Sequence, residues 1–131
     1  SPDLRAFTAR GGTLLMYHGW ADQNIAPRSS VNYHARLVET LGQKQVEDSV
    51  RLFLAPGMAH CGGGEGPNTF DALTALERWR EQGQAPTEII ASHLTATGAV
   101  DRTRPLCAYP QVAKYKGTGS IDQASSFVCS R

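Results

Sequence analysis

The chain has 131 residues, of which 40% are hydrophobic and 19% are charged. This length and composition are typical of one globular domain with a buried core, and they exclude a disordered chain. Thirteen basic and twelve acidic side chains leave a formal charge of +1 at pH 7. Charge therefore gives no reason to expect nucleic acid or an anionic membrane as a partner. No apolar run approaches the roughly 18 residues that a membrane-spanning helix needs.

Three short apolar runs predict β-strands. Residues 13–18 and 50–55 are almost continuously apolar, which is the pattern of strands buried on both faces of a sheet. Residues 89–91 form a third, shorter run. Strands that alternate with helices are typical of the α/β class, in which parallel strands are covered by helices.

Two longer segments have the spacing of an amphipathic helix. The first runs from Pro27 to Leu41, with apolar residues four and three positions apart. The second is predicted to be capped by Asn68, with Asp71 three residues later, and to end at Gly83. Its apolar residues recur at every third position from Phe70 to Trp79.

The remaining segments have weaker patterns. Residues 3–10 are expected to be the end of a helix, and the polar residues 43–49 are expected to form a surface connection. Periodicity fades beyond residue 95, so we expect an irregular tail over residues 96–131 that follows the α/β core portion, residues 1–95. A short helix is expected over residues 120–127.

Three cysteines make an odd count, which by itself does not decide between oxidised and reduced thiols. Cys107 and Cys129 bracket a segment that cannot bury much apolar surface, so we favour a disulfide between them over two free thiols. Closing a loop of this length is worth roughly 3 kcal/mol in the chain-entropy estimate. The tail is therefore predicted to be tied by a disulfide.

Two polar residues each follow a predicted strand. Asp22 lies in the loop after residues 13–18, and His60 lies in the glycine-rich loop after residues 50–55. Active sites of open α/β sheets gather at the carboxyl ends of the strands. An aspartate there can orient an imidazole and stabilise its protonated form, which is the support that a general base needs. The ordinary alternatives are a surface histidine and a turn-forming aspartate.

The same loops suggest other interpretations, for which the sequence offers less support. His18 and Trp20 are candidate pocket residues, with structural packing at the strand end as the alternative. Residues 62–66 are rich in glycine, as in a phosphate-binding loop, but they lack its Lys-Ser/Thr pair, and Glu65 would repel an anion. The four histidines have no spacing typical of a zinc site. We expect no metal and no cofactor in this segment.

Four segments together resemble one family. They are Gly19-Trp20-Ala21-Asp22-Gln23, Pro56-Gly57-Met58-Ala59-His60-Cys61-Gly62-Gly63-Gly64, Pro67-Asn68-Thr69-Phe70-Asp71 and Arg104-Pro105-Leu106-Cys107-Ala108-Tyr109-Pro110. These motifs closely resemble those of the tannase and feruloyl esterase family, over essentially the whole chain. The resemblance implies an α/β-hydrolase with a large lid domain, of which residues 1–131 would be the C-terminal part of one catalytic domain.

The resemblance also implies residue roles. Asp22 matches the acid and His60 the base of a Ser-His-Asp triad. Cys61 matches a cysteine that bonds a second cysteine just before the nucleophilic serine. No Gly-x-Ser-x-Gly elbow, nor the Cys-Ser variant of that elbow, occurs in these residues. The serine, the oxyanion hole, the lid and the calcium site of the lid are therefore expected outside this chain.

The implied function is part of a secreted or periplasmic carboxylic ester hydrolase that acts on small esters of aromatic acids, galloyl, feruloyl or similar. The chain begins Ser1-Pro2-Asp3, and we expect it to be a piece of a longer polypeptide or a mature product. Its first partner would be the missing N-terminal part of the same enzyme. Alone, it is expected to be inactive and to dimerise or swap through an exposed sheet edge. The alternative is an inactive binding or assembly module derived from such an enzyme.

Overall fold

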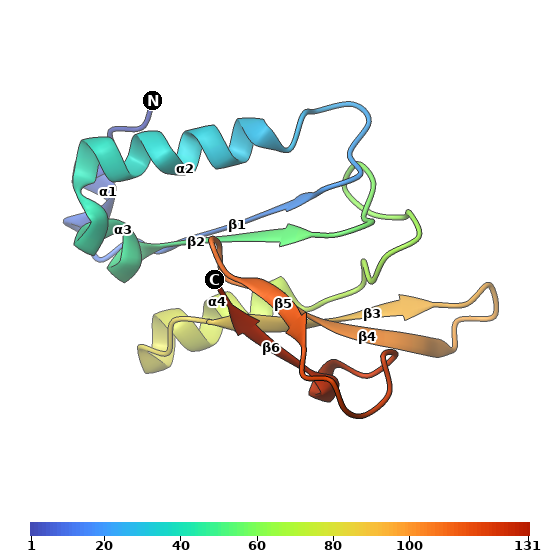
Figure 1. The fold of residues 1–131 in the computed structure, drawn as a ribbon. Coiled ribbons are helices and arrows are strands. Elements are labelled where there is room, and N and C mark those ends of the chain that lie inside the picture. The colour runs from blue at the N-terminus through green and yellow to red at the C-terminus, as the bar shows by residue number, and fades with distance from the viewer.

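A computed structural model describes residues 1–131 as a mixed helix and strand fold (Figure 1). Three pairs of strands form its framework. None of the helices is both long enough and apolar enough to cross a membrane. The elements in chain order are α1 (Arg5–Thr8), β1 (Leu14–Gly19), α2 (Arg28–Leu41), α3 (Gln43–Ser49), β2 (Val50–Ala55), α4 (Ala72–Gln82), β3 (Glu88–Leu94), β4 (Val100–Cys107), β5 (Val112–Tyr115), the 3-10 helix η1 (Ala124–Ser126) and β6 (Phe127–Ser130).

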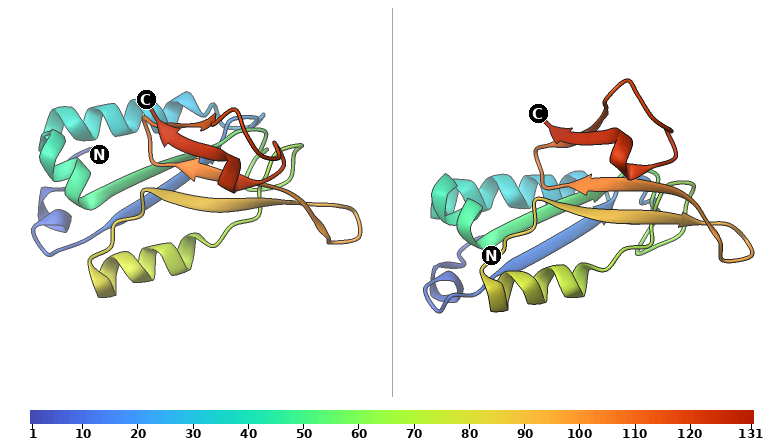
Figure 2. Two further views of the ribbon diagram at one scale, coloured as in Figure 1. Left: turned by 60° about the horizontal axis from the view of Figure 1, so that its bottom comes forward. Right: turned by 90° about the horizontal axis from the view of Figure 1, so that it is seen from below.

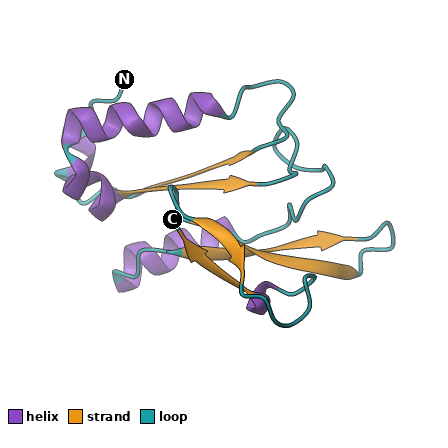
Figure 3. Ribbon diagram, in the orientation of Figure 1, coloured by secondary structure: helices purple, strands orange, loops and turns teal.

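β1 and β2 are parallel neighbours, as predicted for the first two strands. They pair in register from Leu14 opposite Val50 to Gly19 opposite Ala55, so both strands end at the same edge. The loops that follow them gather at that end of the molecule (Figure 3). β2 is mostly buried, but Tyr17 of β1 is 49% exposed. Within residues 1–131 the prediction that the first strand is buried on both faces is therefore wrong, because Phe70 covers only part of the Tyr17 side of β1.

The helices α2 and α3 cover the start of the β1–β2 pair. Leu37 of α2, Val46 of α3 and Val50 of β2 form one buried cluster, against which Leu14 and Tyr33 pack. The predicted surface connection at residues 43–49 is wrong, because this segment is α3. Val46 is its one large apolar residue, and a short helix is enough to turn that side chain into the cluster.

The helix α4 begins three residues later than its predicted cap suggests. Asp71 is the N-cap, since its carboxylate accepts hydrogen bonds from the backbone N–H of Thr74 (2.9 Å) and from the Thr74 hydroxyl (2.7 Å). Gly83 ends the helix in the left-handed conformation, at φ 67°. The prediction that Asn68 caps this helix is wrong, because the Asn68 side chain binds the preceding glycine loop instead.

The third predicted strand is present as β3, but it pairs with β4 in the antiparallel direction. β3 and β4 pair from Glu88 opposite Cys107 to Leu94 opposite Val100. Only residues 95–99 connect them, and a parallel crossover needs a dozen residues or more. The proposed boundary at residue 95 therefore falls inside the turn of a hairpin. A single bridge between Phe53 and Ala108 joins this hairpin to β2.

Residues 96–131 are more regular than predicted. β5 and β6 form a second antiparallel pair, and only η1 is helical where a helix over 120–127 was expected. Such short strands with exposed side chains have too little apolar alternation to be recognised from sequence. Figure 2 shows α4 and the β5–β6 pair on opposite sides of β3 and β4. The main core, between β2, β3 and β4, consists of Phe53, Ala55, Met58, Ile89, Ala91 and Leu106.

The predicted disulfide is confirmed. Cys107 at the end of β4 is bonded to Cys129 in β6, with 5.5 Å between their Cα atoms and a sequence separation of 22. This bond ties the β5–β6 pair to the core, because Cys107 itself is buried.

Removal of this bond is expected to destabilise the domain. In the full-length protein, the double change Cys107→Ser and Cys129→Ser should lower the free energy of unfolding of the domain that contains residues 1–131 by about 3 kcal/mol, since the unfolded chain loses a cross-link. Denaturant unfolding followed by a probe in this domain measures it. Val128→Ser is the matched control, because Val128 is a half-exposed neighbour in β6. An equal stability of the double variant and the control would contradict the expectation.

Candidate active site

The loop after β1 and the loop after β2 are bonded to each other through their backbones. The N–H of Trp20 donates to the carbonyl oxygen of Ala55 (2.9 Å), and the N–H of Ala21 donates to that of Met58 (3.0 Å). These bonds continue the pairing of β1 with β2 past the ends of the strands. They hold the segment that leads to Asp22 against the segment that leads to His60.

Gly19 lies at the closest approach of the two loops and is buried. A Cβ atom at this position would lie 2.2 Å from the carbonyl oxygen of Met58 and 2.6 Å from that of Ala59. Both obstacles are backbone atoms, which cannot turn away as a flexible side chain would. Only glycine allows the two loops to approach this closely.

Asp22 and His60 are in direct contact. Nδ1 of His60 lies 2.9 Å from Oδ2 of Asp22, whose side chain is 4% exposed, against 38% for His60. The other oxygen, Oδ1, accepts hydrogen bonds from the backbone N–H groups of Asn24 and Ile25, both at 2.8 Å. Nε2 of His18 lies 3.0 Å from Oδ2 as well. The structure thus brings together three of the residues singled out from the sequence.

The environment of Asp22 keeps its carboxyl group ionised. Burial alone would raise the pKa of Asp22, but hydrogen bonds outweigh it: the backbone N–H of Ile25, the ring of His60, the backbone N–H of Asn24 and the ring of His18 together lower the pKa well below its ordinary value. A carboxylate held in this way can stabilise a protonated imidazole next to it without taking the proton itself.

A small cavity of about 150 Å³ opens beside this pair of residues. Its lining residues include His18, Asp22 and His60, together with Tyr17 and Met58. Trp20 is not among the residues that line this cavity, and it is 44% exposed. A pocket role for Trp20 stays a prediction.

Cys61 follows His60 directly and also lines the cavity. It is exposed and unbonded within this chain. Its φ of 58° is the one positive value at a residue other than glycine, a conformation that costs a β-carbon-bearing residue some energy. The backbone thus turns sharply between His60 and the glycines that follow.

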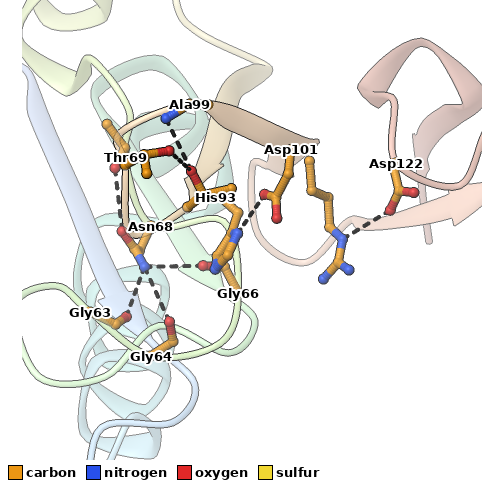
Figure 4. Close-up of polar contacts among 12 residues, drawn as sticks. Gly63, Gly64, Gly66, Asn68, Thr69, His93, Ala99, Asp101 and Asp122 are labelled. Carbon is orange, nitrogen blue, oxygen red and sulfur yellow. Dashed lines mark hydrogen bonds and ion pairs between the residues drawn. The ribbon is translucent and has the colours of Figure 1, made fainter.

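Asn68 holds the glycine loop that follows His60 (Figure 4). Its side-chain NH₂ group faces the carbonyl oxygens of Gly63 (3.1 Å), Gly64 (3.4 Å) and Gly66 (3.1 Å). The same oxygen of Gly63 accepts a hydrogen bond from the backbone N–H of Ala59, the residue before His60 (3.1 Å). Sequence reasoning missed this role, because an asparagine before a helix is equally well explained as a cap.

Nothing in the described residues gathers three or more His, Cys, Asp or Glu side chains where a metal ion could be held. His34 lies in α2, half-buried, with its ring edge-on to that of Tyr109. His93 pairs with Asp101 across the β3–β4 hairpin, with 2.6 Å between Nδ1 and Oδ1 (Figure 4). Both histidines are thus accounted for outside the candidate site.

Comparison with known proteins identifies related chains. The family model described as "Tannase and feruloyl esterase" matches residues 1–130. A mono(2-hydroxyethyl) terephthalate hydrolase from Piscinibacter sakaiensis is 44% identical over 98% of this chain and 21% of its own length. A probable feruloyl esterase from Arthroderma benhamiae is 42% identical over the whole of this chain and 25% of its own length.

A solved structure has the same fold. The crystal structure of an esterase from Aspergillus oryzae superposes with a TM-score of 0.90 at 34% identity, over 99% of this chain and 29% of that one. The chain therefore spans between about a fifth and a third of the length of the relatives that it matches.

The Asn68 contacts predict a local effect. Asn68→Asp replaces the donor by an acceptor that faces three carbonyl oxygens, so the loop over residues 57–66 should open more readily. Amide hydrogen exchange in the full-length protein should accelerate by about tenfold or more in that loop. Asn32→Asp, which adds the same charge on the exposed side of α2, is the control. Unchanged exchange in the Asn68 variant would show that the side chain does not hold the loop.

Proposed function

The chain belongs to the tannase and feruloyl esterase family, a family of carboxylic ester hydrolases, and we propose that it is the C-terminal part of one α/β-hydrolase catalytic domain. Support comes from its match to a fraction of each longer relative and from its parallel β1–β2 pair with polar residues at the carboxyl edge. The antiparallel strands β3 to β6 would complete this end of the domain.

The observation that carries the proposed activity is the contact between Nδ1 of His60 and Oδ2 of Asp22. Since the carboxylate accepts a hydrogen bond at Nδ1, that nitrogen carries the proton and Nε2 has a free lone pair. A neutral imidazole in this tautomer is the general base of a Ser-His-Asp mechanism. The His60 side chain is 38% exposed and forms its hydrogen bond within this chain through Nδ1, so Nε2 is left for a group outside this chain.

In the proposed reaction, a serine outside residues 1–131 attacks the carbonyl carbon of the ester. Nε2 of His60 takes the proton of the serine hydroxyl as the bond to carbon forms, and later delivers it to the leaving alcohol. Asp22 stabilises the imidazolium between the two steps. Water then hydrolyses the acyl-enzyme with the same base.

We propose an ester of an aromatic acid as the substrate. The relatives described above are named for terephthalate and feruloyl esters, and both acyl groups contain an aromatic ring. Apolar residues, among them Ile25 and Met58, line part of the cavity beside His60. Such walls suit a flat apolar acyl group.

We also propose that the whole protein works outside the cytoplasm, in a secreted or periplasmic location. The Cys107–Cys129 disulfide supports this location, because such bonds persist in oxidising compartments.

Substitution of the paired residues tests the mechanism. In the full-length enzyme, His60→Ala and Asp22→Asn should each lower kcat on an aromatic methyl ester by about three orders of magnitude or more, since the base or its orientation is lost. His93→Gln is the control, because His93 pairs with Asp101 in the hairpin. Near wild-type turnover by the His60 variant would instead favour the inactive-module alternative.

The cysteine beside the base gives a second test. In the full-length enzyme we expect Cys61 to bond a cysteine that lies outside residues 1–131 and next to the nucleophile. Such a bond would join the loop that carries His60 to the loop that carries the nucleophile. It would hold the distance between base and nucleophile, and an error of about 1 Å in that distance can lower the rate on the order of a hundredfold. Peptide mapping without reductant identifies the partner. A bond from Cys61 to Cys107 or to Cys129 would rule the idea out, because the loop would then be tied to the tail.

A further inference from the structure

A second histidine shares the carboxylate of Asp22. Nε2 of His18 lies 3.0 Å from Oδ2, the oxygen that also lies 2.9 Å from Nδ1 of His60. His18 comes from β1 itself, and its side chain is only 11% exposed. The reaction proposed above uses His60 and leaves this histidine without a role.

The neighbours of His18 determine which of its nitrogens carries a proton. Nε2 faces two acceptors, Oδ2 of Asp22 and the carbonyl oxygen of Ile25 at 3.1 Å, so Nε2 must carry hydrogen. Nδ1 lies 2.8 Å from the hydroxyl oxygen of Ser30 in α2. In neutral His18 the hydroxyl donates to Nδ1, and every polar atom of the ring is then satisfied.

We propose that His18 is a positioning residue for the ester hydrolysis, which donates a hydrogen bond from Nε2 to Oδ2 of Asp22 and thereby aims that oxygen at His60. This inference rests on the proposed function of Asp22 and His60. The backbone N–H groups of Asn24 and Ile25 fix Oδ1, and His18 fixes Oδ2. With both oxygens held, the carboxylate cannot rotate about its Cβ–Cγ bond.

The shared oxygen also sets how strongly Asp22 favours protonation of His60. A hydrogen bond from His18 draws negative charge from Oδ2, so the carboxylate stabilises the imidazolium of His60 less than it would alone. Asp22 has two histidine partners, His18 and His60, which form ion pairs with it only when they are protonated. The other titratable groups that line the cavity are Tyr17 and Cys61. From α2, Ser30 contributes a neutral hydroxyl.

Two amide substitutions distinguish the hydrogen bond made by Nε2 of His18 from the one made by Nδ1. Glutamine places its NH₂ group near the position of Nε2 and keeps the bond to Asp22. Asparagine places it near Nδ1 and keeps only the contact with Ser30. In the full-length enzyme, His18→Gln should retain kcat within about twofold, whereas His18→Asn should lower it about tenfold, because the carboxylate is no longer aimed.

The pH profile distinguishes positioning from a merely structural role. The acidic limb of kcat/KM reports protonation of the base in the free enzyme. Without the donor, Asp22 holds its full negative charge toward His60, so His18→Asn should move this limb to higher pH than in the wild type. His18→Gln should leave it in place. Equal profiles for the two variants, each with wild-type kcat, would overturn the proposal.

A measurement on the unmodified enzyme keeps the test independent of how the variants fold. In protein labelled with ¹⁵N-histidine, His18 should show a protonated Nε2 and, where it is neutral, an unprotonated Nδ1. An unprotonated Nε2 at His18 would overturn the proposal, because that atom could not donate to Asp22. Full activity of His60→Ala would instead contradict the proposed function. The nitrogen spectrum would still show whether His18 donates a hydrogen bond to Asp22.

Discussion

The in-register pairing of β1 with β2 is the constraint on which the candidate site depends. Gly19 lies opposite Ala55, so the two following loops start level with each other at one edge of the pair. Asp22 and His60 are 38 residues apart in sequence, yet each lies only a few residues past its strand. A shift of one residue in this register would turn the side chains of β1, including His18, to the opposite face.

The candidate site also requires hydrogen-bond partners for both oxygens of the buried Asp22 carboxylate. The backbone of the Asp22 loop supplies two donors, at Asn24 and Ile25, and two histidine rings supply the others. Each donor stabilises the charged form, which burial alone would disfavour. The network therefore keeps the acid charged and immobile at once, and these are the two properties that an orienting group in acyl transfer needs.

The parts of the fold that were predictable depend on local apolar patterns. The continuous apolar run at residues 50–55 and the amphipathic spacing over residues 28–41 each predicted an element that the structure contains. The antiparallel β4 was missed because its sequence includes Arg102, Arg104 and Pro105, which rarely indicate a strand. Residues 43–49 were missed because one valine carries the whole burial signal of α3.

The crowding at Gly19 bears on how related chains can be judged from sequence. Asp22 and His60 are the first residues to compare in a related sequence, but both could be present in a chain in which the two side chains no longer meet. An alanine in place of Gly19 would force the His60 loop away from the Asp22 loop, because its methyl group would overlap two backbone carbonyl oxygens. The contact between Asp22 and His60 therefore depends on the absence of a side chain at Gly19 as well as on the two polar residues themselves.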